Sequence, residues 1–568
     1  MGLHIADYGV LAIYFIFLLI IGFLESRKIK ISKDFFMPQK FGKIFMMMFS
    51  FGTGTHADQA VGVSAKSFTN GLSGIWYQWL YIFATPFYWM IAPVMRRFRA
   101  ITMSDVFESR FNRSVAILFA IVGMWNLTVM IGLMLKGSSE VLSSSAGGLI
   151  SVEYAIAIMT VMFVIYGVSG GLSAAIIIDF VQGILIIIFS FILLPFVLYN
   201  VGGFEGVRQK LADPHMFSLV APADIGIFYI VVLALNGLIG IVTQPHVIAN
   251  CSTGKTEMDG QVGFMGGNLL KRLCTIPWCF TGVIAVVYFA GRAIEPDKVF
   301  GTLANEFLPK IIPGALGIFI AGTMSAVMSG CSTFMLSSSA LFTENVYKPI
   351  WPKKEQKHYI FVGRIAAVVV VAGGMLFAYW LPGVVKGLEI FWMVSAMMAI
   401  AFWLGLFWRG TTVAGAWAAT LVAVFVWWLT TKAFFLSWLN ALPANEALKF
   451  VVTKGAKLEI YLPWQMMFYL VAGTIAGIVV SLFTKPVSKE QLDNFYALVR
   501  TPMAPGEKHL APCTLPPGVV PAPKRSFFPN TSLEIMIPSA NSLIGFLVGW
   551  VCVAVLIYIV YLLANIRL

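Results

Sequence analysis

The stretch that decides the fold is Ser50-Phe51-Gly52-Thr53-Gly54-Thr55-His56-Ala57-Asp58-Gln59. It lies inside an apolar run from 44 to 66, which is long enough to cross the hydrocarbon core of a bilayer. Glycines, hydroxyls, an imidazole and a carboxylate are expected at that depth only where the backbone faces a cavity or a bound ion. The stretch therefore predicts a membrane helix that is broken at a binding site. Glycines that let two helices approach closely are the alternative.

The composition of the whole chain is that of a membrane protein. Hydrophobic residues occupy 59% of the 568 positions, charged residues occupy 11%, and the mean hydropathy is +0.85. We therefore predict an all-α integral membrane protein. Its apolar runs predict about 14 transmembrane helices, near 6–24, 44–66, 74–95, 114–136, 150–168, 172–199, 224–246, 264–290, 312–345, 360–381, 386–408, 411–432, 461–484 and 540–565.

Basic residues indicate the orientation of the chain in the membrane. They gather after the first, third and ninth predicted helices, at Arg27, Lys28, Lys30, Lys33, Lys40, Lys43, Arg96, Arg97, Arg99, Arg110, Arg113, Lys348, Lys353, Lys354 and Lys357. The positive-inside rule makes these loops cytoplasmic and puts both termini outside, although Lys449, Lys454 and Lys457 fall in an outside loop. We predict a multi-pass protein of the plasma membrane, or of the inner membrane if the source is bacterial. The net charge of +13 is then explained by anionic lipids and not by nucleic acid. The oligomeric state stays open, and a monomer is compatible with the sequence.

Asp179 is the only formal charge between Leu172 and Gly203. A carboxylate at the centre of a membrane helix costs about 2.5 to 3.5 kcal/mol on insertion scales, so it needs a compensating partner. A Lys or Arg partner, or a place near the helix end, is one explanation. A bound cation or proton is the other.

The ninth predicted helix carries an unusual number of hydroxyls. They belong to Ser325, Ser329, Ser332, Thr333, Ser337, Ser338 and Ser339. Ser329, Ser332 and Thr333 share one helix face, and their oxygens are donors of the kind that alkali cations accept in place of water. Helix packing through small residues is the alternative.

With these segments identified, the chain resembles the sodium/solute symporter family, which includes sodium-coupled sugar, proline, pantothenate and sialic acid carriers. The resemblance covers roughly residues 5 to 485. Four stretches carry it: Gly170 to Ala174 followed by Asp179 and Gln182, Gln244 to Ile248, Ser329 to Tyr347, and Leu404 to Thr412.

The resemblance implies a leucine-transporter-like core of ten helices in two inverted five-helix repeats, with the first helix of each repeat broken. The predicted helices two to six and seven to eleven would form these repeats. The expected organisation is 1–43, an extra helix and cytoplasmic loop; 44–432, the transport core; 433–484, an outside loop and peripheral helix; 485–539, a mobile proline-rich cytoplasmic linker that buries little apolar surface; and 540–568, a last transmembrane helix.

The family also implies sodium as the coupling ion, bound in up to two sites. The first site aligns with Gly52, Thr55, Ala326, Ser329 and Gly330. Gly330 departs from the family, which usually has Ser or Thr there, so one side-chain ligand is missing.

The second sodium site of some family members is intact in the aligned residues. It corresponds to Asp179, Ser332 and Thr333, with Ser329 shared between the two sites. Our hypothesis is that this second site carries much of the cation binding.

Residues expected to face the solute are Gln59, Gln78, Lys271 and Glu389, with Asp58 and His56 beside them in sequence. They favour a small polar or charged solute, although Lys271 and Glu389 could extend to the membrane surface instead. We predict a sodium-coupled symporter that imports such a solute by alternating access.

Three alternatives to sodium-coupled import remain open. Proton coupling through Asp179, Asp58 or His56 would use the same fold. A membrane sensor lacks a visible output domain in this sequence. A membrane enzyme lacks a nucleophile–base pair, an HExxH motif and an acidic metal cluster, so we expect neither catalytic residues nor an organic cofactor.

Overall fold

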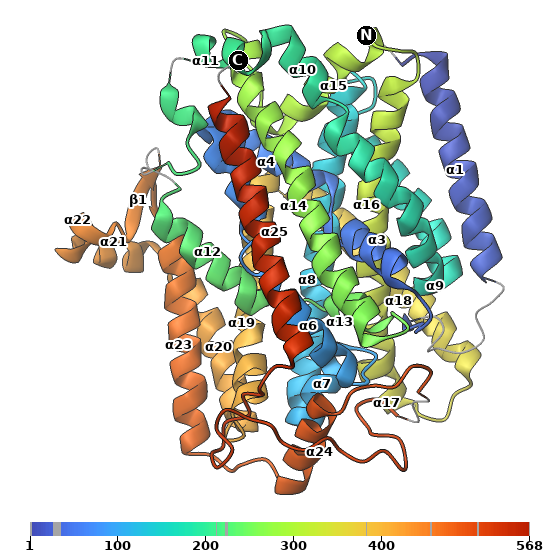
Figure 1. Cartoon of the computed structure of the whole chain (residues 1–568), viewed down its shortest axis with the longest axis vertical. Helices are drawn as coiled ribbons and strands as arrows, with labels where there is room; N and C mark the ends of the chain where they lie inside the picture. Colours follow the sequence, from blue (N-terminus) through green and yellow to red (C-terminus); the bar gives the residue numbers. More distant parts are fainter. Residues whose placement is uncertain are drawn as a thin grey trace.

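The structure is a computed structural model that describes residues 3–26, 36–211, 213–221, 225–381, 383–454, 457–507 and 511–566. Within these residues the chain is mainly helical (Figure 1). The predicted basic loop residues Arg27, Lys28, Lys30 and Lys33 lie outside the described part.

The helices of the first half of the chain pack against those of the second half in one bundle. The elements of the first half are α1 (Ile5–Ser26), α3 (Lys43–Gly54), α4 (Ala57–Asn70), η1 (Gly71–Ile75), α5 (Trp76–Trp79), α6 (Thr85–Arg97), α7 (Met103–Arg110), α8 (Arg113–Ser145), α9 (Val152–Phe191), α10 (Leu194–Val201), α11 (Gly203–Lys210), η2 (Pro214–Phe217), α12 (Ile227–Gly240), η3 (Ile241–Thr243) and α13 (Val247–Ser252). Gly171 interrupts α9 with φ 59°, between the two helices predicted at 150–168 and 172–199.

The second half completes the bundle. Its elements are α14 (Glu257–Tyr288), η4 (Pro296–Lys298), α15 (Val299–Phe307), η5 (Leu308–Lys310), α16 (Ala315–Ala340), the π-helix η6 (Leu341–Tyr347), α17 (Lys348–Ile350), α18 (Gln356–Trp380), α19 (Val384–Phe407), α20 (Val413–Leu429), α21 (Ala433–Ala441), α22 (Ala444–Leu448), β1 (Val451–Lys454), β2 (Lys457–Ile460), α23 (Leu462–Leu482), α24 (Lys489–Arg500) and α25 (Ala540–Asn565). The antiparallel pair β1–β2 departs from the predicted all-α fold, and it lies in the loop between α22 and α23.

Eight of the described helices are long and apolar enough to cross a membrane, and α20 with α21 makes a ninth candidate that is bent by 78°. The chain is therefore a multi-pass membrane protein. Broken or short helices such as α3 and α4 fall below this length, so the number 14 stays a prediction. Figure 1 shows both ends of the chain at one end of the bundle, as an even number of crossings requires.

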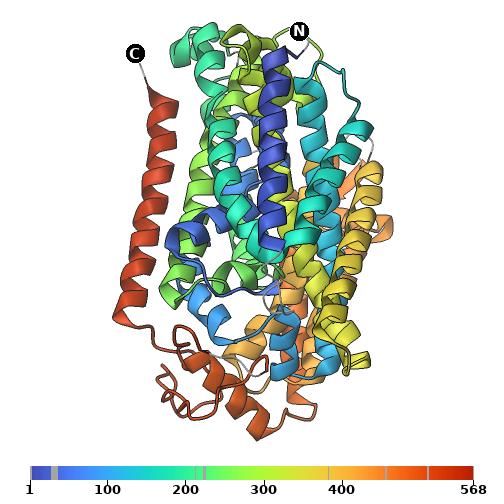
Figure 2. The same cartoon turned by 90° about the vertical axis from the view of Figure 1, so that its right-hand side faces the viewer.

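Helix α16 lies at the centre of the bundle. Nearly all its residues are buried, and it packs against α1, α3, α8, α9 and α18. In contrast, α25 lies at the edge, where it packs on α6 and α14 (Figure 2). The serine-rich helix of the sequence is thus the one most completely removed from lipid.

Two helices are interrupted in the middle of the bundle. Thr55 and His56 separate α3 from α4, and Gln244, Pro245 and His246 separate η3 from α13. Proline has no backbone N–H and restricts the residue before it to an extended conformation, which Gln244 adopts with ψ 117°. The predicted break in the Ser50–Gln59 stretch is confirmed.

Glycines bring α14 close to α3. A Cβ atom on Gly267 would lie 2.6 Å from the carbonyl oxygen of Met47 and 2.7 Å from the nitrogen of Phe51. Any larger residue would push the two helices apart, because backbone atoms cannot give way. Close contact between helices through small residues is therefore present. At this contact the glycine belongs to α14 and not to the Ser50–Gln59 stretch.

The segment predicted as a mobile linker is packed against the bundle. Helix α24 buries Leu492, Phe495 and Tyr496, and the chain after it lies across the end of the molecule that carries α7 (Figure 1). The prediction that this segment buries little apolar surface was wrong. Its proline-rich composition concealed the amphipathic pattern of α24.

Ion pairs from two loops of the bundle hold this segment, and in one of them Arg409 also pairs with Asp493 of α24. Arg99, after α6, pairs with Glu507 at 2.5 Å, and Arg409, after α19, pairs with Glu534 at 2.7 Å. The side chains of Glu507 and Glu534 are only 8% and 1% exposed, so both pairs are largely shielded from solvent. The two arginines that they hold lie in separate loops of the bundle.

Candidate functional site

The break between α3 and α4 is held by the His56 ring. His56 Nε2 lies 2.5 Å from the Thr53 carbonyl oxygen, and Gln59 Nε2 lies 3.1 Å from His56 Nδ1. The two bonds fit a neutral imidazole that donates from Nε2 and accepts at Nδ1. Gln59 Oε1 also accepts from the His56 backbone N–H at 3.4 Å, which completes a capping box for α4.

Asp179 on α9, Gly52 on α3 and Ser329 on α16 meet at one point in the bundle. A Cβ atom on Gly52 would lie 2.6 Å from Ser329 Oγ and 3.7 Å from Asp179 Cγ. All three residues are fully buried. The structure therefore brings together residues that are more than 100 positions apart in sequence.

The oxygens at this meeting point lack hydrogen-bond partners of ordinary geometry. Among the described residues, the Asp179 carboxylate faces the Ser329 hydroxyl without a hydrogen bond of ordinary geometry, and no Lys or Arg pairs with Asp179. A buried carboxylate without compensation is strongly unfavourable. The arrangement suits a cation, because a cation prefers hard oxygen ligands and supplies the missing charge.

The other predicted ion ligands lie on α16 or at the end of α3. Thr53 Oγ1 donates to Thr333 Oγ1 at 3.4 Å, so α3 and α16 face each other here. Ser332 Oγ donates to the Ser329 carbonyl at 3.0 Å. Thr55 is buried with an unpaired hydroxyl, and Ala326 lies one turn before Ser329 on α16.

Gly330 and His56 occupy one shared space. A Cβ atom on Gly330 would lie 2.6 Å from His56 Cδ2 and 2.7 Å from His56 Nε2. Gly330 therefore leaves room for the imidazole and for the methyl group of Met134, and a Ser or Thr there would collide with both. The departure of Gly330 from the family pattern is matched by this histidine, a link between two helices that the sequence alone did not indicate.

Tyr14 on α1 was missed by the sequence analysis. Its hydroxyl accepts from Gln182 Nε2 and from Ser325 Oγ, both at 2.9 Å. Gln182 is one turn from Asp179, and Ser325 is one turn from Ser329, so Tyr14 connects the two helices that supply the ion ligands. A phenol at the centre of an apolar helix was the available signal.

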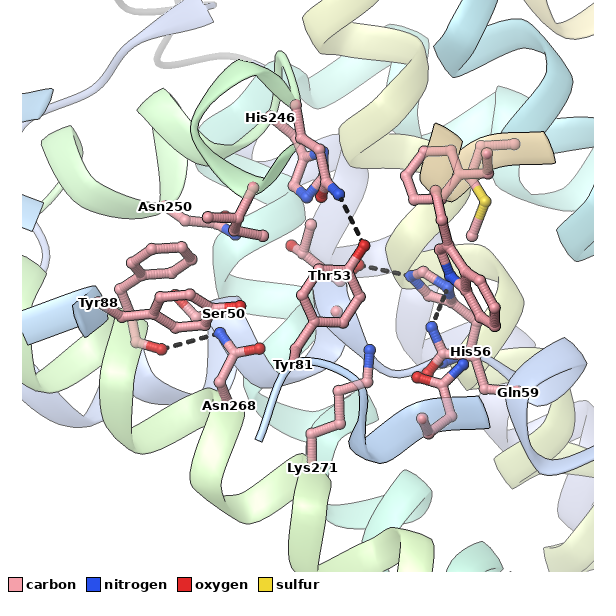
Figure 3. Close-up of a pocket in the computed structure, with 18 of the residues that line it drawn as sticks. Ser50, Thr53, His56, Gln59, Tyr81, Tyr88, His246, Asn250, Asn268 and Lys271 are labelled. Carbon is pink, nitrogen blue, oxygen red and sulfur yellow. Dashed lines mark hydrogen bonds between the residues drawn. The ribbon is translucent and has the colours of Figure 1, made fainter. Parts of the chain in front are cut away.

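A cavity opens beside the α3–α4 break, on the side facing α14 and α19 (Figure 3). The predicted solute residues Gln59, Gln78 and Lys271 line it. Its other polar lining residues, to which the sequence analysis gave no solute-binding role, are Ser50, Thr53, His56, Tyr81, Tyr88, Gln244, His246, Asn250, Asn268 and Arg272.

Several polar atoms of this lining make no hydrogen bond to the described chain. They include Ser50 Oγ, His246 Nδ1 and Asn250 Oδ1, and all three are buried. Phe334 lies between two imidazoles, with ring centroids 5.6 Å from His56 and 4.5 Å from His246. The cavity thus combines an aromatic wall with unpaired polar atoms, a combination that suits a small polar ligand.

Two predicted solute residues do not line the cavity. Glu389 lies at α19, where it accepts from Tyr77 at 3.2 Å and pairs with Lys386 at 3.2 Å. Asp58 is fully buried against Gly137 of α8, with His56 Nδ1 at 3.7 Å. Glu389 follows the lining residue Leu388, and Asp58 precedes the lining residue Gln59. Their positions in the sequence therefore did not distinguish these two carboxylates from the lining residues.

Comparisons with known proteins agree with this geometry. The model of the "Sodium:solute symporter family" matches residues 36–423. The chain is 26% identical over 500 residues to the osmoregulated proline transporter OpuE of Bacillus subtilis, covering 84% of this chain and 95% of the relative. It is 26% identical over 397 residues to the sodium/pantothenate symporter of Escherichia coli, covering 64% and 78% respectively.

The fold is also found among solved structures. A Na+-coupled sialic acid symporter in a substrate-bound outward-open state superposes with a TM-score of 0.67 at 17% identity, over 86% of this chain and 99% of that one. A nucleobase-cation-symport-1 family transporter gives a TM-score of 0.52 at 10% identity, over 82% and 99%. At these identities the likeness concerns the fold alone.

Proposed function

Because this chain belongs to the sodium:solute symporter family, we propose that it imports a small polar organic solute together with sodium, by alternating access. The family and the relatives are transporters, and sodium is the coupling ion. The single observation that carries the proposal is the unpaired Asp179 carboxylate beside Gly52 and Ser329.

The ion-binding part of the proposal has two sites of unequal quality. Asp179, Ser329, Ser332 and Thr333 form the main sodium site, where a carboxylate supplies the compensating charge. The other site, at Gly52, Thr55, Ala326 and Ser329, lacks a hydroxyl at Gly330 and has the His56 ring in its place. We therefore assign most of the sodium binding to the Asp179 site.

The solute is proposed to bind in the cavity at the α3–α4 break. Gln59, Gln78 and Lys271 line it, and its unpaired polar atoms would be satisfied by a polar solute. Asp58 and Glu389 are not proposed to contact the solute directly, since neither residue lines the cavity.

The proposed core consists of ten helices in two inverted repeats within residues 44–432. The two interrupted helices support this arrangement, because each would begin one repeat: α3–α4 the first, and α12–η3–α13 the second. Broken helices at the membrane midplane leave backbone groups free to bind ions and solutes. Rocking of one part of the core against the other would then expose the cavity to each side in turn.

The proposal is tested on the purified protein in two steps. Sodium chloride is expected to raise the unfolding temperature above its value in potassium chloride, because an ion that binds only the folded state stabilises it. Proteoliposomes with an inward sodium gradient should then accumulate a small polar solute. Uptake that follows pH and ignores sodium would instead select the proton-coupled alternative. Binding without any gradient-driven uptake would select a sensor.

The shared space of Gly330 and His56 gives a sharper prediction. Gly330→Ser alone is expected to lower the unfolding temperature, because the new side chain meets the imidazole. The double variant His56→Ala with Gly330→Ser removes the collision with the ring, leaves only the flexible end of Met134 to move aside, and adds a hydroxyl ligand worth about 1 kcal/mol. The sodium concentration for half-maximal stabilisation should fall roughly fivefold relative to His56→Ala alone. The explanation fails if Gly330→Ser is as stable as the parent protein.

A further inference from the structure

Lys271 is a buried cation without a fixed partner. It lies near the middle of α14, is 6% exposed, and its side chain runs beside the break, where a Cβ atom on Gly54 would lie 3.9 Å from Lys271 Cδ. Figure 3 shows its amino group directed between Tyr81 and the His56–Gln59 pair. No described residue forms an ion pair or a side-chain hydrogen bond with it.

Arg272, the next residue, differs from Lys271 because its side chain already has partners within the protein. Its Nη1 donates to the Gln78 carbonyl at 2.7 Å, and its guanidinium lies 5.6 Å from the Tyr81 ring centroid. Arg272 therefore has a structural role at the same wall of the cavity, yet it adds a second positive charge there.

The carboxylates near the cavity do not neutralise these two cations. The described lining contains no Asp or Glu. Glu389 already pairs with Lys386, and Asp179 would be neutralised by the sodium of the proposed site. Asp58 faces α8 and offsets only one of the two positive charges. With sodium bound, the region keeps one uncompensated positive charge, which is strongly unfavourable in a buried site.

The backbone adds to the same preference. Helix α4 begins at Ala57, directly beside the cavity-lining residue His56, and the N-terminal end of a helix carries partial positive charge. Gln59 and Gln78 supply polar contacts, and Phe334 and Trp392 supply apolar wall.

From this balance of charges we propose that the transported solute is a small organic carboxylate whose anionic group binds the Lys271 ammonium at the N-terminal end of α4. The inference rests on the proposed function and deepens it. Lys271 is then the residue that selects solutes by charge, and the solute completes the neutralisation of the cavity. Neutral sugars and polyols, which leave Lys271 unpaired, are excluded as preferred solutes.

The test compares acids with their amides on the purified protein in sodium chloride. Lactate, nicotinate and proline are each paired with lactamide, nicotinamide and prolinamide, and galactose serves as a neutral solute. At least one acid is expected to raise the unfolding temperature by several degrees while its amide does not. Lys271→Met should abolish that shift and leave the acid-free unfolding temperature unchanged or higher, because it removes an uncompensated buried charge.

Arg272→Met is the matched comparison for the neighbouring cation. It should lower the acid-free unfolding temperature, since it leaves the Gln78 carbonyl without its donor. The inference is overturned if amides or galactose stabilise the protein as well as acids, if no acid does, or if Lys271→Met destabilises the protein as Arg272→Met does. In all these cases sodium still stabilises the protein, whereas loss of the sodium effect itself would refute the proposed function.

Discussion

Asp179→Asn is expected to remove sodium-dependent uptake and sodium-dependent stabilisation at the sodium concentrations that suffice for the parent protein. The substitution removes the only formal charge at the meeting point of Gly52, Asp179 and Ser329. A charged partner at a buried site contributes about 3 kcal/mol, which corresponds to a roughly hundredfold weaker affinity for sodium. In potassium chloride the variant should be at least as stable as the parent, because an unpaired buried carboxylate has been neutralised. Unfolding temperatures measured across a sodium titration give both quantities.

Asp105→Asn provides the matched control for this experiment. Asp105 is a partly buried carboxylate, but it accepts hydrogen bonds from the backbone N–H groups of Ile101 and Thr102 and from Asn345 Nδ2 at 2.6 Å. Neutralising Asp105 should therefore lower the unfolding temperature and leave the response to sodium intact. If Asp179→Asn keeps the sodium requirement of the parent, the Asp179 site does not carry the cation.

Gly52→Ala is expected to impair sodium binding by adding one methyl group. That methyl would lie 2.6 Å from Ser329 Oγ, on the side that faces Asp179. Overpacking of this kind costs about 1 to 3 kcal/mol, so the sodium concentration for half-maximal stabilisation should rise roughly tenfold or more. The same sodium titration measures the effect.

Gly54→Ala makes the same chemical change two residues further along α3. Its methyl would meet only Lys271 Cδ, at the ordinary contact distance of 3.9 Å. Both variants gain similar helix propensity, so that contribution cancels in the comparison. Equal sodium responses in the two variants would show that the space around Gly52 is not part of the ion site.

The sequence predicted those features of the protein that arise from residues which are energetically unfavourable inside a membrane. A carboxylate, two glycines and a run of hydroxyls are expensive in hydrocarbon, and Asp179, Gly52 and Ser329 do meet in the structure. The family resemblance is confirmed by the match to residues 36–423. Residues that are unfavourable in their own segment therefore pointed to a shared site before any contact was known.

The sequence did not predict features that depend on contacts between distant segments. Nothing in α3 alone shows that the His56 ring fills the space at Gly330, and nothing in α1 shows that Tyr14 reaches Gln182 and Ser325. Glu389 was expected at the solute, but Lys386, three residues earlier, pairs with it. Such partners become visible only when the helices are packed together.

The segment that crosses the α7 end of the bundle has a mechanical consequence. From Glu507 to Glu534 the chain runs for 27 residues, or about 90 Å of extended contour. Helix α8, with 33 residues, is about 50 Å long, so no displacement within this molecule could pull the segment taut. Separation of its anchors at Arg99 and Arg409 is resisted by their ion pairs and by hydrogen bonds in the same loops, including Arg409 N–H to the Ser532 carbonyl and Arg99 Nη1–H to the Thr501 carbonyl. The segment is therefore attached to the bundle by contacts that can break and form again. Its length does not limit how far the helices can move.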